Sequence, residues 1–201
     1  AYGDVALMDD RDQITSASGN VRRSGRTAVG DEFFELCAEN FICAPATLVR
    51  SEALRSLLPV PSEYSFLDWY VTTGIAHRWK TAFSPAVVAH YRVHEGNQHT
   101  RMVFDRSGEK ISFSVLDRLW QDSHRAAEKK TTGKRIYGDK YYTYADKYFG
   151  VGMNFEARRC FLQGLVREPC GILAGGRWRR LAATWLPRNV YERGKAALKR
   201  L

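Results

Sequence analysis

The spacing of apolar residues changes along the chain, and each spacing predicts a kind of element. Ala1 to Met8 is a short apolar run typical of a strand, and the acidic residues after it indicate a turn. The run from Phe41 to Val49 is also apolar and favours extended structure, although Pro45 interrupts it. Residues 14–30 are rich in Ser, Gly, Thr and Arg without a sustained period, which predicts a mobile loop.

Three- and four-residue spacing predicts helices in the first half of the chain. One helix spans residues 31–38, with a buried face formed by Phe33, Phe34 and Cys37. A short helix begins at Ser51, whose hydroxyl is suited to cap it. A third helix follows Asp68 and covers residues 69–79, where we interpret His77 as a packed or surface histidine rather than a ligand.

The second half of the chain has mainly helical periodicity. Residues 104–130 predict one long amphipathic helix that ends at Thr131–Gly133, with an apolar stripe formed by Ile111, Val115, Leu116, Leu119 and Trp120. Residues 141–169 have the spacing of one helix pair of the tetratricopeptide type. A solenoid needs about three or more such repeats, so we expect a single hairpin with its tyrosines in a core.

The last segment, residues 172–201, mixes aromatic and basic residues. Its Trp, Leu and Tyr residues alternate with eight Lys and Arg residues against one acid, Glu192. Such a helix is suited to lie on an anionic membrane surface, and it is equally suited to dock on its own domain with its charges in water. The sequence leaves both interpretations open.

Composition limits the class of protein. The chain has 201 residues, 44% hydrophobic residues, a net charge of +9 and a pI near 9.5, which favours anionic partners. No stretch approaches the ~20 apolar residues of a membrane-spanning helix, and no signal peptide is visible. The four cysteines have no CxxC spacing, which argues against zinc and favours reduced thiols and a cytoplasmic location.

Residues 66–99 carry the candidate chemistry. Asp68 stands among large apolar residues at a predicted helix start, where it is either a simple cap or a functional carboxylate. Residues 86–89 predict a buried strand. Beyond them, alternation places Arg92 and His94 on one face, and two basic side chains there are suited to an anion or a metal.

An acid at a helix start, followed by Tyr91-Arg92-Val93-His94, resembles the C-terminal half of the family 2 glycosyltransferases. Further short matches come in the same order: residues 2–5 with Asp9 and Asp10 are similar to the strand and turn after the family's metal-binding motif. Residues 40–42 and 48–50 are similar to the segment that leads toward its acceptor site. The resemblance covers residues 1–105 well and the remainder loosely.

The resemblance implies an α/β fold, namely the C-terminal part of a GT-A fold followed by an α-helical extension. It divides the chain into an acceptor-side half at 1–105 and a helical extension with a basic amphipathic tail at 106–201. It implies an inverting enzyme that moves a sugar from a nucleotide-sugar donor to a hydroxyl of a saccharide or lipid-linked acceptor. The roles that it implies are Asp68 as general base, Asn40, Trp69, Tyr91 and Arg92 at the substrate, and His94 near a divalent cation, Mg²⁺ or Mn²⁺. From the residues alone, Trp69 and Tyr91 are equally suited to a core.

Two departures from the family pattern bear on these roles. The family usually has an acidic pair where this chain has Leu67-Asp68. Its nucleotide-binding half and main metal ligands would lie upstream of Ala1, so we expect the chain to be a fragment that is inactive by itself. The competing interpretation is a non-catalytic basic module that contacts nucleic acid, or a helical protein scaffold. No nucleic-acid-binding motif supports contact with nucleic acid. The expectation of a location at the cytoplasmic face of a membrane depends on the basic tail.

Overall fold

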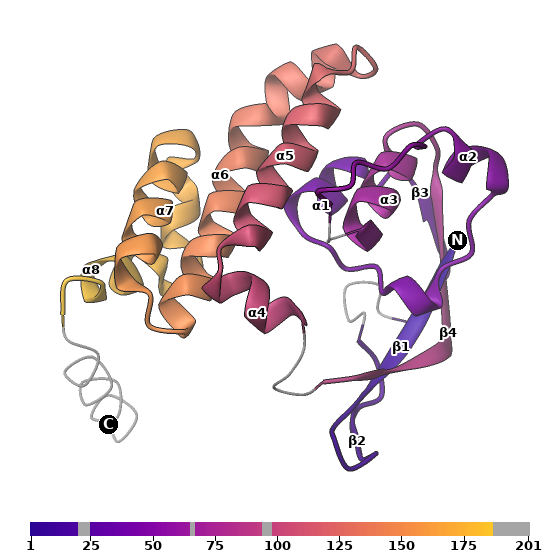
Figure 1. Cartoon of the computed structure of the whole chain (residues 1–201), viewed down its shortest axis with the longest axis horizontal. Helices are drawn as coiled ribbons and strands as arrows, with labels where there is room; N and C mark the ends of the chain where they lie inside the picture. The colour runs from indigo at the N-terminus through magenta and orange to yellow at the C-terminus, as the bar shows by residue number, and fades with distance from the viewer. Residues whose placement is uncertain (20–24, 65–66, 94–97, 187–201) are drawn as a thin grey trace. The chain divides into compact units, whose positions relative to one another are not determined.

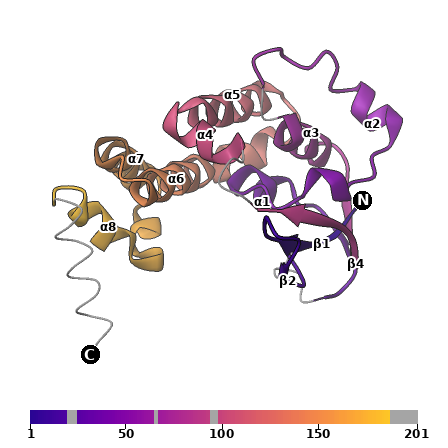
Figure 2. The ribbon, with the colours of Figure 1, turned by 60° about the horizontal axis from the view of Figure 1, so that its bottom comes forward.

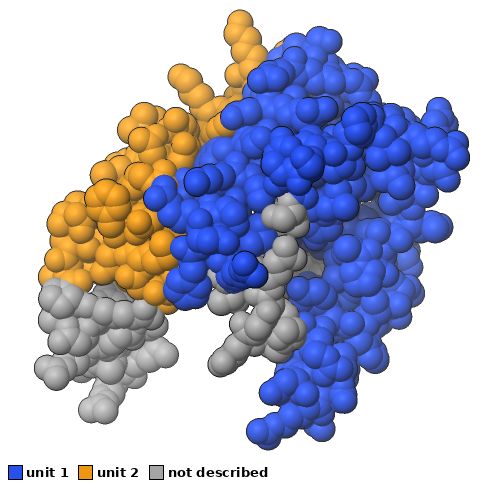
Figure 3. Space-filling model, viewed as in Figure 1, with its two compact units in different colours: residues 1–126 blue, residues 127–201 orange. Residues whose placement is uncertain are grey.

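The structure of the protein is a computed structural model that describes residues 1–19, 25–64, 67–93 and 98–186, with the side chains of 98–100 left undescribed. It divides into two compact units, residues 1–126 (unit 1) and 127–201 (unit 2), shown in different colours in Figure 3. The division therefore lies later in the chain than the predicted boundary at residue 105. Unit 1 is mixed α/β and unit 2 is helical in its described part.

A curled four-stranded sheet forms the base of unit 1 (Figure 1). Its order is β2-β1-β4-β3, where the strands are β1 (Tyr2–Met8), β2 (Ile14–Ser16), β3 (Ala28–Gly30) and β4 (Thr81–Arg92). The two long central strands, β1 and β4, run parallel, whereas β2 and β3 pair antiparallel at the edges. The predicted strand at residues 1–8 is thus confirmed.

The two central strands approach each other closely at a glycine. Gly3 pairs with Ser84, and a Cβ at this position would lie 2.5 Å from Cγ2 of Val88. The register between the strands shifts on both sides of Asp4, so β4 carries extra residues opposite β1. A residue with a side chain at position 3 would push β4 away from β1.

Four short helices connect β3 to β4. They are α1 (Phe33–Ala38), the 3₁₀ turn η2 (Ala44–Ala46), α2 (Ser51–Arg55) and α3 (Leu67–Ala76). Figures 1 and 2 show α1 and α3 on the same face of the sheet. Buried Glu32, just before α1, accepts hydrogen bonds from the hydroxyls of Tyr2 and Thr81, and thereby ties this layer to both central strands.

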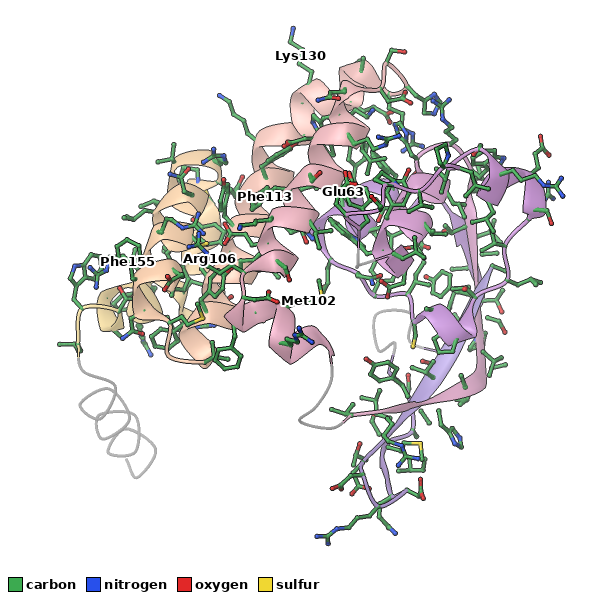
Figure 4. All side chains as sticks on the ribbon, in the orientation of Figure 1. Glu63, Met102, Arg106, Phe113, Lys130 and Phe155 are labelled. Atoms are coloured by element: carbon green, nitrogen blue, oxygen red, sulfur yellow. The ribbon has the colours of Figure 1, made fainter. Side chains whose placement is uncertain are left out.

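Helices α4 (Gln98–Phe104) and α5 (Ser107–Gln121) complete unit 1. Met102 on α4, labelled in Figure 4, is 6% exposed. Beyond α5, the guanidinium of Arg125 pairs with the Asp31 carboxylate and lies over the rings of Phe33 and Phe34. Its hydrogen bond and charge lower the pKa of Asp31.

Unit 2 is a helical hairpin with a shorter third segment. Helix α6 (Ala126–Gly150) and α7 (Asn154–Arg167) form the hairpin, followed by the 3₁₀ segment η3 (Pro169–Gly176) and α8 (Arg177–Ala183). Gly152 makes the turn at φ +82°, a conformation that favours glycine. Tyr142, Tyr148 and Phe161 are fully buried, so the predicted hairpin with core tyrosines is confirmed.

Several local predictions are wrong. The residue 14–30 segment contains strands β2 and β3 instead of being all loop, because β2 pairs with the neighbouring strand β1 and β3 pairs with β4, which is far away in the sequence. Residues 41–49 form no strand and contain η2, where Pro45 starts a 3₁₀ turn. Helix α2 has Arg50 at its N-cap, without a side-chain cap, so Ser51 does not cap it.

The long helix predicted at 104–130 is also wrong, because two breaks divide it. Arg106 adopts φ +61° between α4 and α5, and Arg125 adopts φ +59° between α5 and α6. Asp122 ends α5 in an extended conformation, accepts a hydrogen bond from the His124 amide, and pairs with Arg78. Residues 131–133, predicted to end the helix, lie inside α6.

The predicted burial of residues 86–89 is wrong as well. They lie in β4 as expected, but Val87 and Val88 are 47% and 56% exposed. Strand β3 pairs with β4 only at residues 81–83, so β1 is the only described strand paired with this part of β4.

None of the described helices is long and apolar enough to cross a bilayer.

Candidate functional site

Asp68 lies in the first turn of α3, as its sequence context predicts. Its carboxylate is half-buried, and Oδ1 accepts a hydrogen bond of 2.8 Å from the amide of Trp69. Free amide groups and the positive end of the helix dipole stabilise a negative charge at this place. The carboxylate therefore retains access to solvent while its orientation is fixed by the backbone.

Asn40 contacts Asp68 although 28 residues separate them. Its Nδ2 donates a long hydrogen bond of 3.4 Å to Oδ2 of Asp68. Oδ1 of Asn40 is buried and has no hydrogen-bond partner among the described residues. The structure thus brings together two residues that the resemblance places at the substrate.

Trp69 explains why Asp68 and Asn40 meet. Its side chain is fully buried, and its indole Nε1 donates a 2.7 Å hydrogen bond to the carbonyl of Leu36 in the last turn of α1. This bond anchors the start of α3 beside the segment that follows α1, where Asn40 lies. Trp69 therefore belongs to the core, one of the two roles that the sequence left open.

Cys43 is a neighbour of Asp68 that the sequence analysis did not identify. Burial raises the pKa of its thiol, and the negative charge of Asp68 raises it further. A thiol with a raised pKa is a poor nucleophile at neutral pH. No spacing motif marks Cys43, because the fold brings it near Asp68 from 25 residues away in the chain.

Tyr91 and Arg92 lie at the C-terminal end of β4, opposite Leu7 and Met8. Tyr91 is 40% exposed. Arg92 donates hydrogen bonds to the carbonyl of Asp9 and to the carboxylate of Asp12, at 2.9 and 2.5 Å. No hydrogen bond or ion pair of the described residues joins Arg92 to Asp68, so the structure uses Arg92 to hold the turn after β1.

His94, the expected metal neighbour, lies outside the described residues. Within the described ranges, no group of three or more His, Cys, Asp and Glu side chains is arranged to hold a metal ion. The described part of the chain therefore does not fit the divalent cation that the resemblance implies. None of the four cysteines, all of them described, forms a disulfide.

The basic side chains in the described part of unit 2 are largely engaged by the unit itself. Arg177 and Arg180 both pair with Asp146, at 3.0 and 2.6 Å. Arg158 donates to Thr184 and lies over the ring of Trp185, and Arg167 donates to Gln163. The part of the predicted basic tail beyond residue 186 lies outside the described residues.

A pocket of about 450 Å³ opens in unit 1. Its walls come from the first residues of β1 and β4, from β3, from residues 42–53, and from α3 with the turn that follows it. Thr72 and Ile75 of α3 line it, and they share a helix face with Asp68, which lies beyond the pocket at the start of the helix. The sequence analysis did not predict this pocket, because its lining residues come together only in the folded chain.

Comparison of the chain with family models, with curated proteins and with solved structures finds no match.

Proposed function

We propose that unit 1 is the acceptor-side half of an inverting glycosyltransferase, in which Asp68 is the general base. The observation that supports this most is the contact between Asp68 and Asn40. The resemblance to the family 2 glycosyltransferases assigns both residues to the substrate independently of any structure. The GT-A fold and the nucleotide-sugar donor remain part of this proposal.

The proposed reaction is a single displacement. The carboxylate of Asp68 removes the proton from the acceptor hydroxyl while that oxygen attacks the anomeric carbon, and the nucleoside diphosphate leaves from the opposite face. Asp68 has the properties that a base needs: it is half-buried, it is oriented by the Trp69 amide, and its second oxygen is held by Asn40. Trp69 supports the base from the core and does not face the substrate.

A divalent cation at the diphosphate would take its ligands from outside the described residues, since these provide no metal-binding group. In this proposal the described residues act on the acceptor hydroxyl and its proton.

The test is the Asp68→Asn variant of this protein, assayed with uridine-, guanosine- and thymidine-diphosphate sugars for release of the nucleoside diphosphate. Asparagine keeps the size of the side chain but does not accept a proton, so we expect turnover to fall about 10²- to 10⁴-fold. The matched control is Glu52→Gln, an exposed acid in the first turn of α2, which should leave turnover unchanged. Normal turnover of Asp68→Asn would refute the assignment of the base.

A further inference from the structure

The pocket of unit 1 has the size of a small-molecule site. Its volume of about 450 Å³ falls within the range of roughly 300–1,000 Å³ found for ligand pockets. It lies in one compact unit and is lined by residues from β1, β3, β4, α2 and α3. The pocket therefore belongs to the fold of unit 1 itself.

The walls of the pocket are mainly apolar. Ile42, Val49, Ile75 and Trp79 contribute to them, and the apolar side chains continue outward to the surface. At the surface, Val29 and Leu48 line the pocket while being 71% and 77% exposed. Single exposed apolar residues are ordinary, but two that continue an apolar pocket indicate that an apolar body binds there.

The polar groups of the pocket favour an anion. Arg50 and Lys80 line it and are exposed, and no acidic residue lines it. The Arg50 side chain has no hydrogen bond or ion pair with the residues that the structure describes. The positive charge of Lys80 contributes to lowering the pKa of Asp31. Two cations without an acid among the lining residues attract a negatively charged group.

The hydroxyl groups of the pocket are already used. Thr47 donates to the carbonyl of Ala44, Thr72 to the carbonyl of Asp68, and Thr81 to Glu32. A neutral polar head would therefore find few free side-chain donors among these residues. The guanidinium of Arg50 is the strongest side-chain donor that remains.

We propose that this pocket binds one amphiphilic molecule, whose aliphatic body occupies the apolar walls and whose phosphate or carboxylate head lies against Arg50 and Lys80. Binding at this pocket does not require Asp68 to act as a base, so it stands independently of sugar transfer. A membrane lipid and a free amphiphile share this chemistry. The experiment separates the two sources.

The probe is dodecyl phosphate, titrated into the 201-residue chain below its critical micelle concentration and followed by calorimetry. We expect saturable binding of one molecule per chain. Inorganic phosphate has no apolar body, and dodecyltrimethylammonium has the opposite charge, so both should bind at least about tenfold more weakly. Equal binding of dodecyl phosphate and dodecyltrimethylammonium would overturn the proposal, because detergent would then be binding without regard to Arg50 and Lys80.

Two variants with matched controls locate the site. Arg50→Ala removes the main head-group donor, and Leu48→Asp places a negative charge at the apolar mouth, so each should weaken binding about tenfold or more. Arg55→Ala, on the exposed surface of α2 outside the pocket, and Val166→Asp, 80% exposed in α7, should bind as the parent does. Unchanged binding in both pocket variants would place the amphiphile elsewhere and refute the site.

Vesicles that contain phosphatidate distinguish the source of the ligand. If the chain sediments with them and Leu48→Asp does not, the pocket takes its ligand from a membrane. If only monomeric dodecyl phosphate depends on Leu48, the pocket takes a free amphiphile. Both results support the pocket, whereas dependence of neither probe on Leu48 or Arg50 refutes it.

Discussion

Units 1 and 2 are stabilised by contacts of very different sequence separation. In unit 1, β1 pairs with β4, where Tyr2 lies opposite Phe83, and Arg125 pairs with Asp31 across 94 residues. In the described part of unit 2, the contacts reach less far along the chain: the hydroxyl of Tyr142 donates to the carbonyl of Glu168, 26 residues away, and Arg180 pairs with Asp146 across 34 residues. Unit 1 therefore depends on long loop closures, whereas unit 2 is built by neighbouring helices.

The difference also appears at the surfaces of the two units. Unit 1 has a pocket, a half-buried carboxylate at a helix start and an exposed strand segment. The exposed apolar residues of unit 2 include Phe155, labelled in Figure 4, Leu162 and Val166, which share one face of α7. The pocket and the half-buried carboxylate thus both lie in the unit whose contacts join distant parts of the chain. This arrangement is common, because a site built by several segments can combine unlike chemical groups.

The largest expected effect tests the long-range core of unit 1. Trp69→Ala removes a fully buried indole and leaves the carbonyl of Leu36 without its donor, so we expect the free energy of unfolding to fall by about 3–5 kcal/mol. Guanidinium denaturation of the parent and the variant measures this decrease in the free energy of unfolding. The matched control is Trp178→Ala in unit 2, 51% exposed, which should cost less than about 1 kcal/mol. Similar losses for the two variants would contradict the central role of Trp69.

An intermediate effect tests the tight packing of unit 2. A Cβ at Gly164 would lie 2.8–3.0 Å from ring atoms of Tyr142, and the other side of that ring is closed by Gly171. Gly164→Ala should therefore cost about 1–3 kcal/mol, even though alanine has the higher helix propensity. Gly150→Ala is the control, because an added Cβ there meets nothing within 4 Å. Stabilisation by Gly164→Ala would show that the hairpin can open at this contact.

The smallest expected effect is a difference between the units in how stability depends on alkaline pH. Burial raises the pKa of Tyr142 to about 12, above the value near 10 of an unfolded tyrosine. The unfolded chain loses this proton first, so the stabilisation is complete below pH ~10 and decreases as the pH rises toward 12. Tyr142→Phe should flatten this alkaline decrease in urea titrations, whereas Tyr91→Phe, which removes an exposed phenol of unit 1, should leave it unchanged. If stability decreased equally with alkaline pH in Tyr142→Phe and in the parent, the raised pKa of Tyr142 would be contradicted.

The elements themselves could be predicted where local pattern decides them. The strand at residues 2–8, the helix with Asp68 in its first turn, and the helix pair within residues 141–167 follow from spacing and turn residues, whereas the start of α6 at Ala126 does not. Helix breaks that depend on tertiary contacts could not be predicted from the sequence. Asp122, at the end of α5, pairs with Arg78, which lies 44 residues earlier in the chain, and apolar spacing near residue 122 does not reveal such a partner.

The candidate site likewise combines features that local sequence decides with features that only tertiary contacts decide. Local sequence was sufficient to place Asp68 at a helix start, because capping and the helix dipole act within one turn. Only the tertiary structure decided that Asn40 contacts Asp68, that Trp69 is buried beneath it, and that Val87 and Val88 are exposed. The pocket likewise appears only when residues as far apart in the chain as Ala1 and Ala82 meet. Backbone conformation depends mainly on neighbours in the chain, whereas burial and contact depend on which distant segments pack together, and apolar periodicity does not specify those partners.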